Sequence, residues 1–397
     1  MGKIDETENI LELFLYAAGE SEIPTSWIKW SGISAIAASL SDRVYYRKYA
    51  WKVLPPNMYI MLVGDSGLGK GGAMDFALQF IDPRMNLLYG STTKQSLIDR
   101  MCGEAEEGEM SKSKVFIIQD ELGEAVGSGQ VADAFIKAMT GWYGATSGTI
   151  EENTRMHGRK VVSDPPCINW LSGTTNEWLR DAVDYKAMMS GFFGRVCTVP
   201  GKSDYDNRIY RPQIVRDYDQ VVGYLKERFE ELTYLNGEFQ MLPAAEELDR
   251  EWYENRPKPS QGMEPFWRRE HALILKLAMI LSVCDYMDLV IHPKHIIGAQ
   301  ELVREIRSYM PEVIEHAAKG GVTTAASRVQ AKIYEHKLGI NRTDLLRFMN
   351  RFGLKAMDLD TIITHLSQQD LVETSKRGQR TWYIRKSKPG ILWGSVD

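Results

Sequence analysis

Apolar residues near the start of the chain recur at the spacing of an amphipathic helix. The pattern covers Ile10–Ala18 and, after a break at Pro24, the run Trp27–Leu40. Positions three and four apart share one face of a helix, so each run can bury a continuous apolar stripe. The pair Pro55-Pro56 then interrupts the pattern. We therefore expect residues 1–57 to form a helical N-terminal segment.

From Met58 onward, short apolar runs alternate with amphipathic stretches. This alternation is typical of a parallel sheet whose strands are joined by helices. Strands are expected at Met58–Val63, Asn86–Tyr89, Val115–Gln119, Cys167–Ser172 and Val196–Val199. Helices are expected between them at Gly71–Ile81, Thr93–Met101, Asp133–Gly141 and Asn176–Val183. The pattern predicts an α/β core with a parallel sheet over residues 58–203.

The next hundred residues are mostly amphipathic helix. Helical spacing runs from Tyr218 to Ala318, and Glu270–Tyr286 is its most apolar part. Gly320-Gly321 follows and is a plausible hinge, because glycine leaves the backbone free to turn. We expect a helical lid or linker region over residues 204–322.

The C-terminal segment has a different order of elements. Three helices are expected from residue 327 onward, with Asn341 capping the second and Asp358 capping the third, Leu359–Gln369. The runs Leu371–Thr374 and Thr381–Ile384 then alternate around a turn at residues 376–379. Three helices and a two-stranded wing make up a winged helix-turn-helix, which we expect over residues 323–397.

Charge is distributed unevenly along the chain. The whole sequence has a formal net charge of −5, but residues 325–397 hold 13 Lys and Arg against 7 Asp and Glu, a net of +6. The preceding residues therefore carry a net of −11. A basic module on an acidic body suggests an anionic partner for the C-terminal segment. A merely solvated basic surface is the alternative.

Two further features narrow the class of protein. No apolar run approaches the roughly 18 residues of a membrane-spanning helix, and the N-terminus lacks the apolar stretch of a signal peptide. The four cysteines are widely spaced without a C-x-x-C motif, so neither a zinc site nor a disulfide framework is indicated. The sequence predicts a cytoplasmic protein with no membrane partner.

A glycine-rich stretch follows the predicted strand Met58–Val63 and precedes a predicted helix. It reads G-x-x-x-x-G-K and comprises Gly64, Asp65, Ser66, Gly67, Leu68, Gly69 and Lys70, with Gly71 and Gly72 next. In this context the glycines let successive backbone N–H groups converge on phosphate oxygens, and the lysine adds a positive charge. We expect this P-loop to bind the phosphates of ATP.

Position 71 departs from the usual pattern of such loops. Ser or Thr normally follows the lysine, and its hydroxyl ligates the Mg²⁺ of the nucleotide. Here the residue is Gly71, and neither Gly72 nor Ala73 replaces the hydroxyl. Either water fills that coordination position or the metal is held weakly.

An acidic pair follows the apolar run Val115–Gln119. Asp120 and Glu121 would emerge at the C-terminal end of a strand, where ligands gather in open α/β sheets. Asp120 is expected to hold Mg²⁺ and its waters, and Glu121 to polarise the attacking water as general base. The alternative is that both are solvated loop charges.

Two more positions complete the expected catalytic set. Asn176 follows a strand that we place between the P-loop strand and the acidic strand, so Asn176 can hold the attacking water, with Thr175 behind it. Helix capping by Asn176 is the alternative. Arg195 ends the run Gly191–Arg195 and is expected to reach the γ-phosphate of a neighbouring subunit. A local salt bridge of Arg195 is the alternative.

The order of these motifs resembles that of the AAA+ ATPases, and more narrowly that of phage and plasmid replicative helicases related to superfamily 3. The likeness covers roughly residues 24–200 and is carried by Leu54–Gly64, Gly173–Asn176 and Gly191–Arg195. It implies a ring, commonly a hexamer, with active sites shared between neighbours and single-stranded DNA in a central channel. It also makes Arg268 and Arg269 candidates to touch the nucleotide, although ordinary helix surface charge explains them as well.

The resemblance also implies a DNA-gripping hairpin before the strand at Cys167. Thr149-Ile150 and Lys160–Val162 can pair around a polar tip, and the phosphate contacts would be Arg155, His157, Arg159 and Lys160. A solvated hairpin without a ligand is the alternative. In the C-terminal segment, the residues expected to face duplex or fork DNA are Thr361, Thr364, His365 and Gln368 on the recognition helix and Lys376, Arg377 and Arg380 on the wing. Winged helices also contact proteins, which is the alternative there.

These inferences predict an ATP-dependent DNA helicase or translocase that acts as a ring during replication of a phage or other mobile element, in the cytoplasm of a bacterial host. A nucleotide-switched loader, initiator or regulator that binds DNA without unwinding it is the first alternative. A small-molecule phosphotransferase is the second. Only 63 residues precede the P-loop, so a separate primase or initiator is an expected partner.

Overall fold

The computed structural model describes residues 9–90, 92–103, 110–122, 130–145, 149–154, 158–162, 164–176, 191–201, 209, 214–259, 263–336, 339–350, 355–368, 370–378 and 380–386. The chain divides into two compact units, Met1–Glu315 and His316–Asp397. Each unit contains buried apolar side chains of its own and is described by itself.

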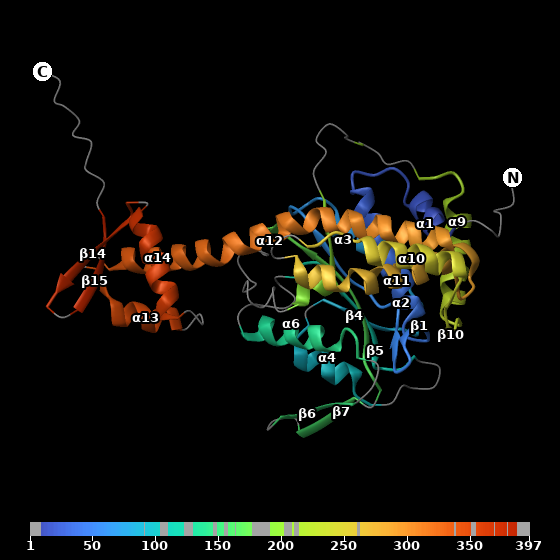
Figure 1. Ribbon diagram of the computed structural model, residues 1–397, viewed down its shortest axis with the longest axis horizontal. Helices are drawn as coiled ribbons and strands as arrows, with labels where there is room; N and C mark the ends of the chain where they lie inside the picture. The colour runs from blue at the N-terminus through green and yellow to red at the C-terminus, as the bar shows by residue number, and fades with distance from the viewer. Residues whose placement is uncertain are drawn as a thin grey trace, which may run out of the picture. The chain divides into compact units, whose positions relative to one another are not determined.

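The first unit is an α/β structure around a five-stranded, all-parallel sheet (Figure 1). In spatial order the strands are β4 (Asn86–Tyr89), β5 (Lys114–Gln119), β8 (Cys167–Thr174), β3 (Tyr59–Val63) and β9 (Val196–Pro200). All five predicted strands are confirmed, and β8 lies between β3 and β5 as expected. Every residue of β3 is buried, which is normal for a parallel strand covered on both faces.

The helices that join these strands lie close to their predicted positions. They are α3 (Lys70–Leu78), α4 (Lys94–Met101) and α6 (Gln130–Trp142). Thr93 caps α4, because its hydroxyl accepts a hydrogen bond from the Ser96 N–H at 3.1 Å and the Ser96 hydroxyl accepts one from the Thr93 N–H. The predicted helix Asn176–Val183 lies outside the described residues after Asn176.

The N-terminal helices are α1 (Ile10–Ala18) and α2 (Thr25–Leu40), as the apolar spacing predicts. Helix α2 packs against α3 and against the sheet strands β3, β8 and β9, and most of its residues are buried. The prediction that helix continues to residue 57 is wrong. Strands β1 (Val44–Tyr49) and β2 (Lys52–Leu54) form an antiparallel hairpin instead. Aromatic and β-branched residues favour the pleated strand there.

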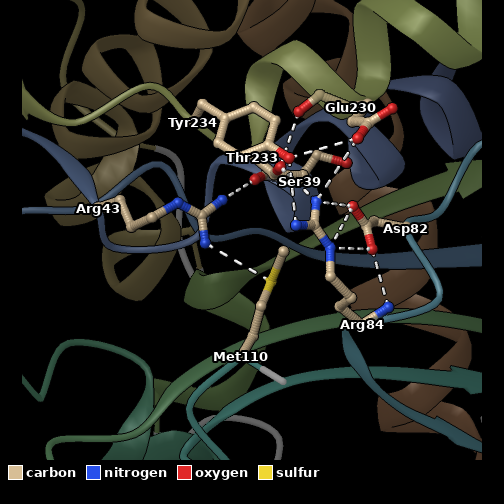
Figure 2. Close-up of polar contacts among 8 residues, drawn as sticks. All are labelled: Ser39, Arg43, Asp82, Arg84, Met110, Glu230, Thr233 and Tyr234. Atoms are coloured by element: carbon tan, nitrogen blue, oxygen red, sulfur yellow. Dashed lines mark hydrogen bonds and ion pairs between the residues drawn. The ribbon is translucent and has the colours of Figure 1, made fainter. Parts of the chain in front are cut away.

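Strand β1 also pairs in parallel with β10 (Gly237–Glu238), which lies far along the chain. Figure 2 shows how Arg43, the residue before β1, is fixed: its guanidinium donates to the Ser39 carbonyl and lies 3.7 Å from the Met110 sulfur. In the same view Arg84 donates to Asp82 and to the Tyr234 hydroxyl, at 3.2 Å for the latter. Arg43 thus joins the start of β1 to the loop before β5, and Arg84 joins the loop before β4 to the segment after α9.

The region predicted to be helical contains four helices among the described residues. They are α9 (Tyr218–Leu232), α10 (Pro243–Asn255), α11 (Glu264–Tyr286) and α12 (Pro293–Glu335). Strands β11 (Gln240–Met241) and β12 (Val290–Ile291) pair in parallel between them. Helix α12 continues through Gly320-Gly321, so the backbone does not break at the predicted hinge.

The second unit contains three helices in the described part and a small sheet. After the end of α12 come β13 (Ile340–Asn341), α13 (Arg342–Asn350), α14 (Ala356–Gln368), β14 (Val372–Arg377) and β15 (Arg380–Arg385). The three strands lie in the order β13-β15-β14. Asn341 caps α13, since its side chain accepts from the Asp344 N–H at 3.0 Å.

Two details of this unit differ from prediction. Helix α14 begins at Ala356, so Asp358 lies in its first turn rather than at the cap. There the Asp358 carboxylate accepts a hydrogen bond from the Lys355 N–H at 2.7 Å. Strand β13 is additional, and it pairs with β15 outside the predicted hairpin.

Candidate nucleotide-binding site

The loop of residues 64–69 joins β3 to α3 at the C-terminal edge of the sheet. Gly69 ends it in the left-handed region, at φ 88°, directly before the helix. A Cβ atom at position 69 would lie 2.7 Å from Cγ1 of Ile23, which packs beneath the loop. Both the backbone conformation and the packing therefore require glycine at this position.

Lys70 is the first residue of α3, and its side chain is folded back over this loop. The ammonium group donates to the Gly64 carbonyl at 2.7 Å and to the Asp65 carbonyl at 2.9 Å. Only 7% of Lys70 is exposed. Burial lowers the pKa of Lys70, and the nearby carboxylates of Glu121 and Asp120 oppose that shift. Lys70 and the predicted acidic pair, Asp120 and Glu121, thus lie close enough for their charges to interact.

Asp120 follows β5 and lies between two glycines. A Cβ atom at Gly71 would be 2.9 Å from Oδ1 of Asp120, and a Cβ atom at Gly173 would be 2.3 Å from its backbone oxygen. The carboxylate therefore fills the space that a side chain at position 71 would need. Position 71 thus lacks a hydroxyl, and a carboxylate oxygen of Asp120 lies against the first turn of α3 in its place.

The C-terminal end of β8 lies between the C-terminal ends of β3 and β5. Its Thr174 carbonyl accepts a hydrogen bond from the Gly64 N–H at 3.2 Å, which ties β8 to the start of the loop. Asn176 follows two residues later and is exposed. Lys70, the acidic pair and Asn176 therefore follow the C-terminal ends of three adjacent strands, β3, β5 and β8.

Sequence reasoning missed several residues at this edge. Within the described residues, the hydroxyl of Thr174 and the amide nitrogen of Gln119 are buried without a hydrogen-bond partner. Both end strands that are otherwise largely apolar, and that contrast is a signal the sequence does contain. Trp27 is buried, and its ring lies 5.7 Å from the Lys70 ammonium. No local pattern reveals the approach of Ile23 and Trp27, because they come from the segment leading into α2 and from its first turn.

Arg195 lies at the N-terminal ends of the sheet strands, whereas the loop of residues 64–69 lies at their C-terminal ends. It ends the short 3-10 helix η2 (Phe193–Arg195), and the next residue, Val196, pairs with Tyr59 at the start of β3. The loop with Lys70 follows the other end of β3, so the length of the strand, about 3.3 Å for each residue, separates the two cations. The structure does not bring Arg195 and Lys70 together within one chain.

Arg195 has a second arginine beside it. Its Nη1 donates to the Gly191 carbonyl at 2.6 Å, and Arg269 at the start of α11 donates to the Pro265 carbonyl at 2.9 Å. Burial lowers the pKa of Arg195, and the charge of Arg269 lowers it further. Arg195 forms no ion pair with any residue that the structure describes, so the predicted alternative of a local salt bridge is not found there.

The expected DNA-gripping hairpin is formed by β6 (Ile150–Thr154) and β7 (Gly158–Val162), which are antiparallel. Arg155 and His157 lie outside the described residues. Lys160 pairs with Asp99 of α4 at 2.5 Å, and Arg159 pairs with Glu151 at 2.8 Å. The two described cations are therefore already matched by carboxylates of the chain.

The expected contacts of the C-terminal unit are accessible. Thr361, Thr364, His365 and Gln368 are exposed on α14, while Lys376, Arg377 and Arg380 are exposed on β14 and β15. The Arg377 guanidinium lies 5.1 Å from the centroid of the Trp382 ring. This unit therefore presents both polar and cationic side chains at its surface.

No protein-family model matches the sequence, and a search of curated proteins finds no match. Among the described helices, none is long and apolar enough to cross a membrane. The described side chains also contain no group of three or more His, Cys, Asp or Glu that is arranged to hold a metal ion.

Proposed function

We propose that the chain hydrolyses a magnesium-bound nucleoside triphosphate and uses that reaction to move along or unwind DNA. The observation that carries the proposal is the approach of Lys70, at the start of α3, to Asp120 and Glu121, directly after β5, at the C-terminal ends of the parallel strands. A lysine at a glycine-rich helix start and an acidic pair one strand away are the parts that triphosphate hydrolysis needs.

In this proposal the ammonium group of Lys70 leaves the two loop carbonyls and binds the β- and γ-phosphates. Backbone N–H groups of the loop and the start of α3 hold the remaining phosphate oxygens. Asp120 faces the magnesium of the substrate from beside Gly71. Glu121 accepts a proton from the water that attacks the γ-phosphorus, while the bond from that phosphorus to the bridging oxygen breaks.

The proposed reaction takes place between two copies of the chain. Arg195 lies at the N-terminal end of β9, away from the Lys70 of its own chain, so in this proposal it acts on a γ-phosphate bound to a neighbouring copy. Charge supplied to the γ-phosphate in this way accelerates hydrolysis by several orders of magnitude. The resemblance to ring-forming replicative helicases agrees with such sharing and favours a hexamer with a separate primase or initiator.

Contact with DNA rests on two surfaces in this proposal. Single-stranded DNA would lie along the β6–β7 hairpin, where Lys160 and Arg159 exchange their carboxylate partners for phosphates. We take α13, α14 and the β14–β15 hairpin of the second unit as parts of a winged helix-turn-helix, whose exposed Lys376, Arg377 and Arg380 would suit duplex or fork DNA.

The test measures ATP hydrolysis and unwinding of a forked DNA duplex by the wild type, Lys70→Ala and Glu121→Gln. We expect both activities to be lost in both variants, and to persist in Lys226→Ala, which removes an exposed lysine of α9. Hydrolysis that survives Lys70→Ala and Glu121→Gln would refute the assignment of the site.

One observation favours a second function for the same site. Asp120 crowds position 71, where other loops of this type supply a hydroxyl to magnesium. A slow hydrolase of this kind would act as a nucleotide-switched loader, initiator or regulator on DNA. Nucleotide-dependent DNA binding without unwinding by the wild type would support this function over the motor.

A further inference from the structure

The hairpin β1–β2 carries a cluster of aromatic and cationic residues that the proposed function does not use. Its residues are Val44, Tyr45, Tyr46, Arg47, Lys48, Tyr49, Ala50, Trp51, Lys52, Val53 and Leu54. Four of these eleven residues are aromatic, three are cationic and none is acidic. We call Lys48, Tyr49, Trp51 and Lys52 the hairpin tip.

The two aromatic rings of the hairpin tip are stacked on each other and exposed to solvent. The ring centroids of Tyr49 and Trp51 are 5.6 Å apart, and the ring planes are inclined by only 15°. Trp51 is 85% exposed and Tyr49 is 50% exposed. Because Tyr49 covers one face of the indole, the high exposure leaves the other face open. Tyrosine and tryptophan are enriched at binding interfaces, which makes an exposed pair of these rings a candidate binding surface.

Cations flank this ring pair on both sides in the sequence. The Lys48 ammonium lies 5.8 Å from the centroid of the Tyr49 ring, and Lys52 follows Trp51 directly and is exposed. Neither lysine forms an ion pair with the part of the chain that the structure describes. Neither ammonium group is therefore neutralised by an ion pair within the described residues; Lys52 is exposed and Lys48 is half-buried.

Lys48 lies near charges of both signs. Burial lowers the pKa of Lys48, and the charges of Lys52 and Arg256 act in the same direction, while Asp249 opposes them. Arg256 is held among aromatic rings, with its guanidinium 3.7 Å from the Trp267 centroid and 4.6 Å from that of Tyr253. One carboxylate oxygen of Asp249 lies 2.8 Å from a ring nitrogen of His271, and its other oxygen has no hydrogen-bond partner within the described residues.

The base of the hairpin is fixed, so its tip is presented in a defined position. Strand β1 pairs with β2 on one side and with β10 on the other, and the β1–β10 edge can be followed in Figure 1. Arg47 pairs with Glu238 of β10 at 2.8 Å, and Arg43 holds the start of the strand (Figure 2). A ring platform on a fixed support loses little conformational freedom when a ligand stacks on it.

We propose that the hairpin tip binds single-stranded nucleic acid, with a base stacked on the open face of Trp51 and neighbouring phosphates on Lys48 and Lys52. Stacking on exposed aromatic rings beside a cationic path is how proteins hold single strands without reading their sequence. Bases in a duplex are already stacked on one another and offer no free face. Protein interfaces are depleted in lysine, so the flanking lysines favour phosphate over a protein partner.

This site is independent of the proposed hydrolysis, since Lys70 and the acidic pair take no part in it. The test measures the affinity of the full-length protein for fluorescein-labelled (dT)15 by anisotropy, without nucleotide. Trp51→Ala should bind at least about fivefold more weakly, because a stacked base contributes that much or more. Trp51→Phe should keep most of the affinity, because it keeps a ring. Tyr286→Ala, which removes another half-exposed ring beside a lysine, should bind as the wild type does.

The contribution of the two lysines to binding is measured separately, from the salt dependence of the affinity. The double variant Lys48→Gln/Lys52→Gln should reduce the slope of log affinity against log salt by about 1.4, since each phosphate contact with a single strand contributes about 0.7. A 15-base-pair duplex should show no difference between the wild type and Trp51→Ala. An equal loss for duplex and single strand would overturn the assignment to single strands.

Photocrosslinking locates the contact directly. A (dT)15 strand that contains 5-iodouracil should crosslink to the tryptic peptide Tyr49–Lys52 in the wild type and in Lys70→Ala. Unchanged (dT)15 affinity of Trp51→Ala together with no crosslink in this peptide overturns the proposal. A change of oligomeric mass in Trp51→Ala, measured by light scattering, with unchanged DNA affinity would assign the tip to a protein interface instead. Loss of hydrolysis in Lys70→Ala leaves each of these results intact.

Discussion

The buried lysine of α11 gives the most quantitative prediction. Lys276 is 1% exposed, and its ammonium donates to the backbone carbonyl of Asn57 at 2.8 Å and to its side-chain oxygen at 2.6 Å. The ammonium also lies 4.0 Å from the centroid of the Tyr143 ring. Lys276 has no ion pair within the described residues, and burial lowers its pKa to about 7 from 10.5.

The sign of the pH dependence follows from this shift. Between pH 7 and pH 10.5 the unfolded chain binds a proton at Lys276 that the folded chain lacks. Stability therefore rises with pH in this window, by about 1.4 kcal/mol for each pH unit. The penalty for burying the charge is present in full below pH 7. From pH 7.5 to 9.5 the wild type should gain about 2–3 kcal/mol at this residue.

Lys276→Met isolates this contribution, because methionine fills most of the same space without a titrating group. The free energy of unfolding is measured by guanidinium denaturation with tryptophan fluorescence at pH 7.5, 8.5 and 9.5. The wild type should gain stability relative to Lys276→Met as the pH rises, whereas Lys226→Met should follow the wild type. Parallel curves for the wild type and Lys276→Met would refute the reasoning.

Three further substitutions probe the packing around the site and the adjoining helices. Gly173→Ala places a Cβ atom 2.3 Å from the Asp120 backbone oxygen, and it should lower the free energy of unfolding by about 1–3 kcal/mol; an unchanged denaturation midpoint would contradict this. Gly71→Ser crowds the Asp120 carboxylate and should lower kcat for ATP hydrolysis with little change in nucleotide affinity. A higher kcat would instead mean that the hydroxyl restores a magnesium ligand. Arg307→Ala leaves the fully buried Glu270 carboxylate unpaired and should lower the free energy of unfolding by about 3–5 kcal/mol. The double variant Glu270→Gln/Arg307→Ala should recover part of this loss. A loss below about 1 kcal/mol in Arg307→Ala would show that water reaches Glu270.

The sheet could be predicted from the sequence because its signal is local. Each strand is a short apolar run, and every residue of β3 is buried. The hairpin β1–β2 has a weaker local signal, its aromatic and β-branched residues, which the helical interpretation of residues 1–57 overlooked. Its strand β1 is stabilised by pairing with β10, whose residues lie almost two hundred positions further on. A periodicity search over neighbouring residues contains no information about such a partner.

The candidate site also has one part that the sequence predicts and one part that it does not. Parallel strands place their C-terminal ends at one edge, so the approach of Lys70 to Asp120 follows from the strand order. The position of Asp120 between Gly71 and Gly173 does not follow, because it depends on distances of a few ångströms between α3, β5 and β8. The sequence shows a hydroxyl missing at position 71 but not the carboxylate that occupies its place.

The placement of Arg195 at the far edge of the sheet has a consequence for mixtures of inactive variants. On the proposed function, Lys70→Ala and Arg195→Ala each abolish hydrolysis, yet each keeps the part that the other lacks. A ring assembled from both contains junctions in which an intact Lys70 faces an intact Arg195 from the adjacent copy. Mixing two inactive preparations should therefore restore part of the activity, and dilution below the assembly concentration should abolish it again.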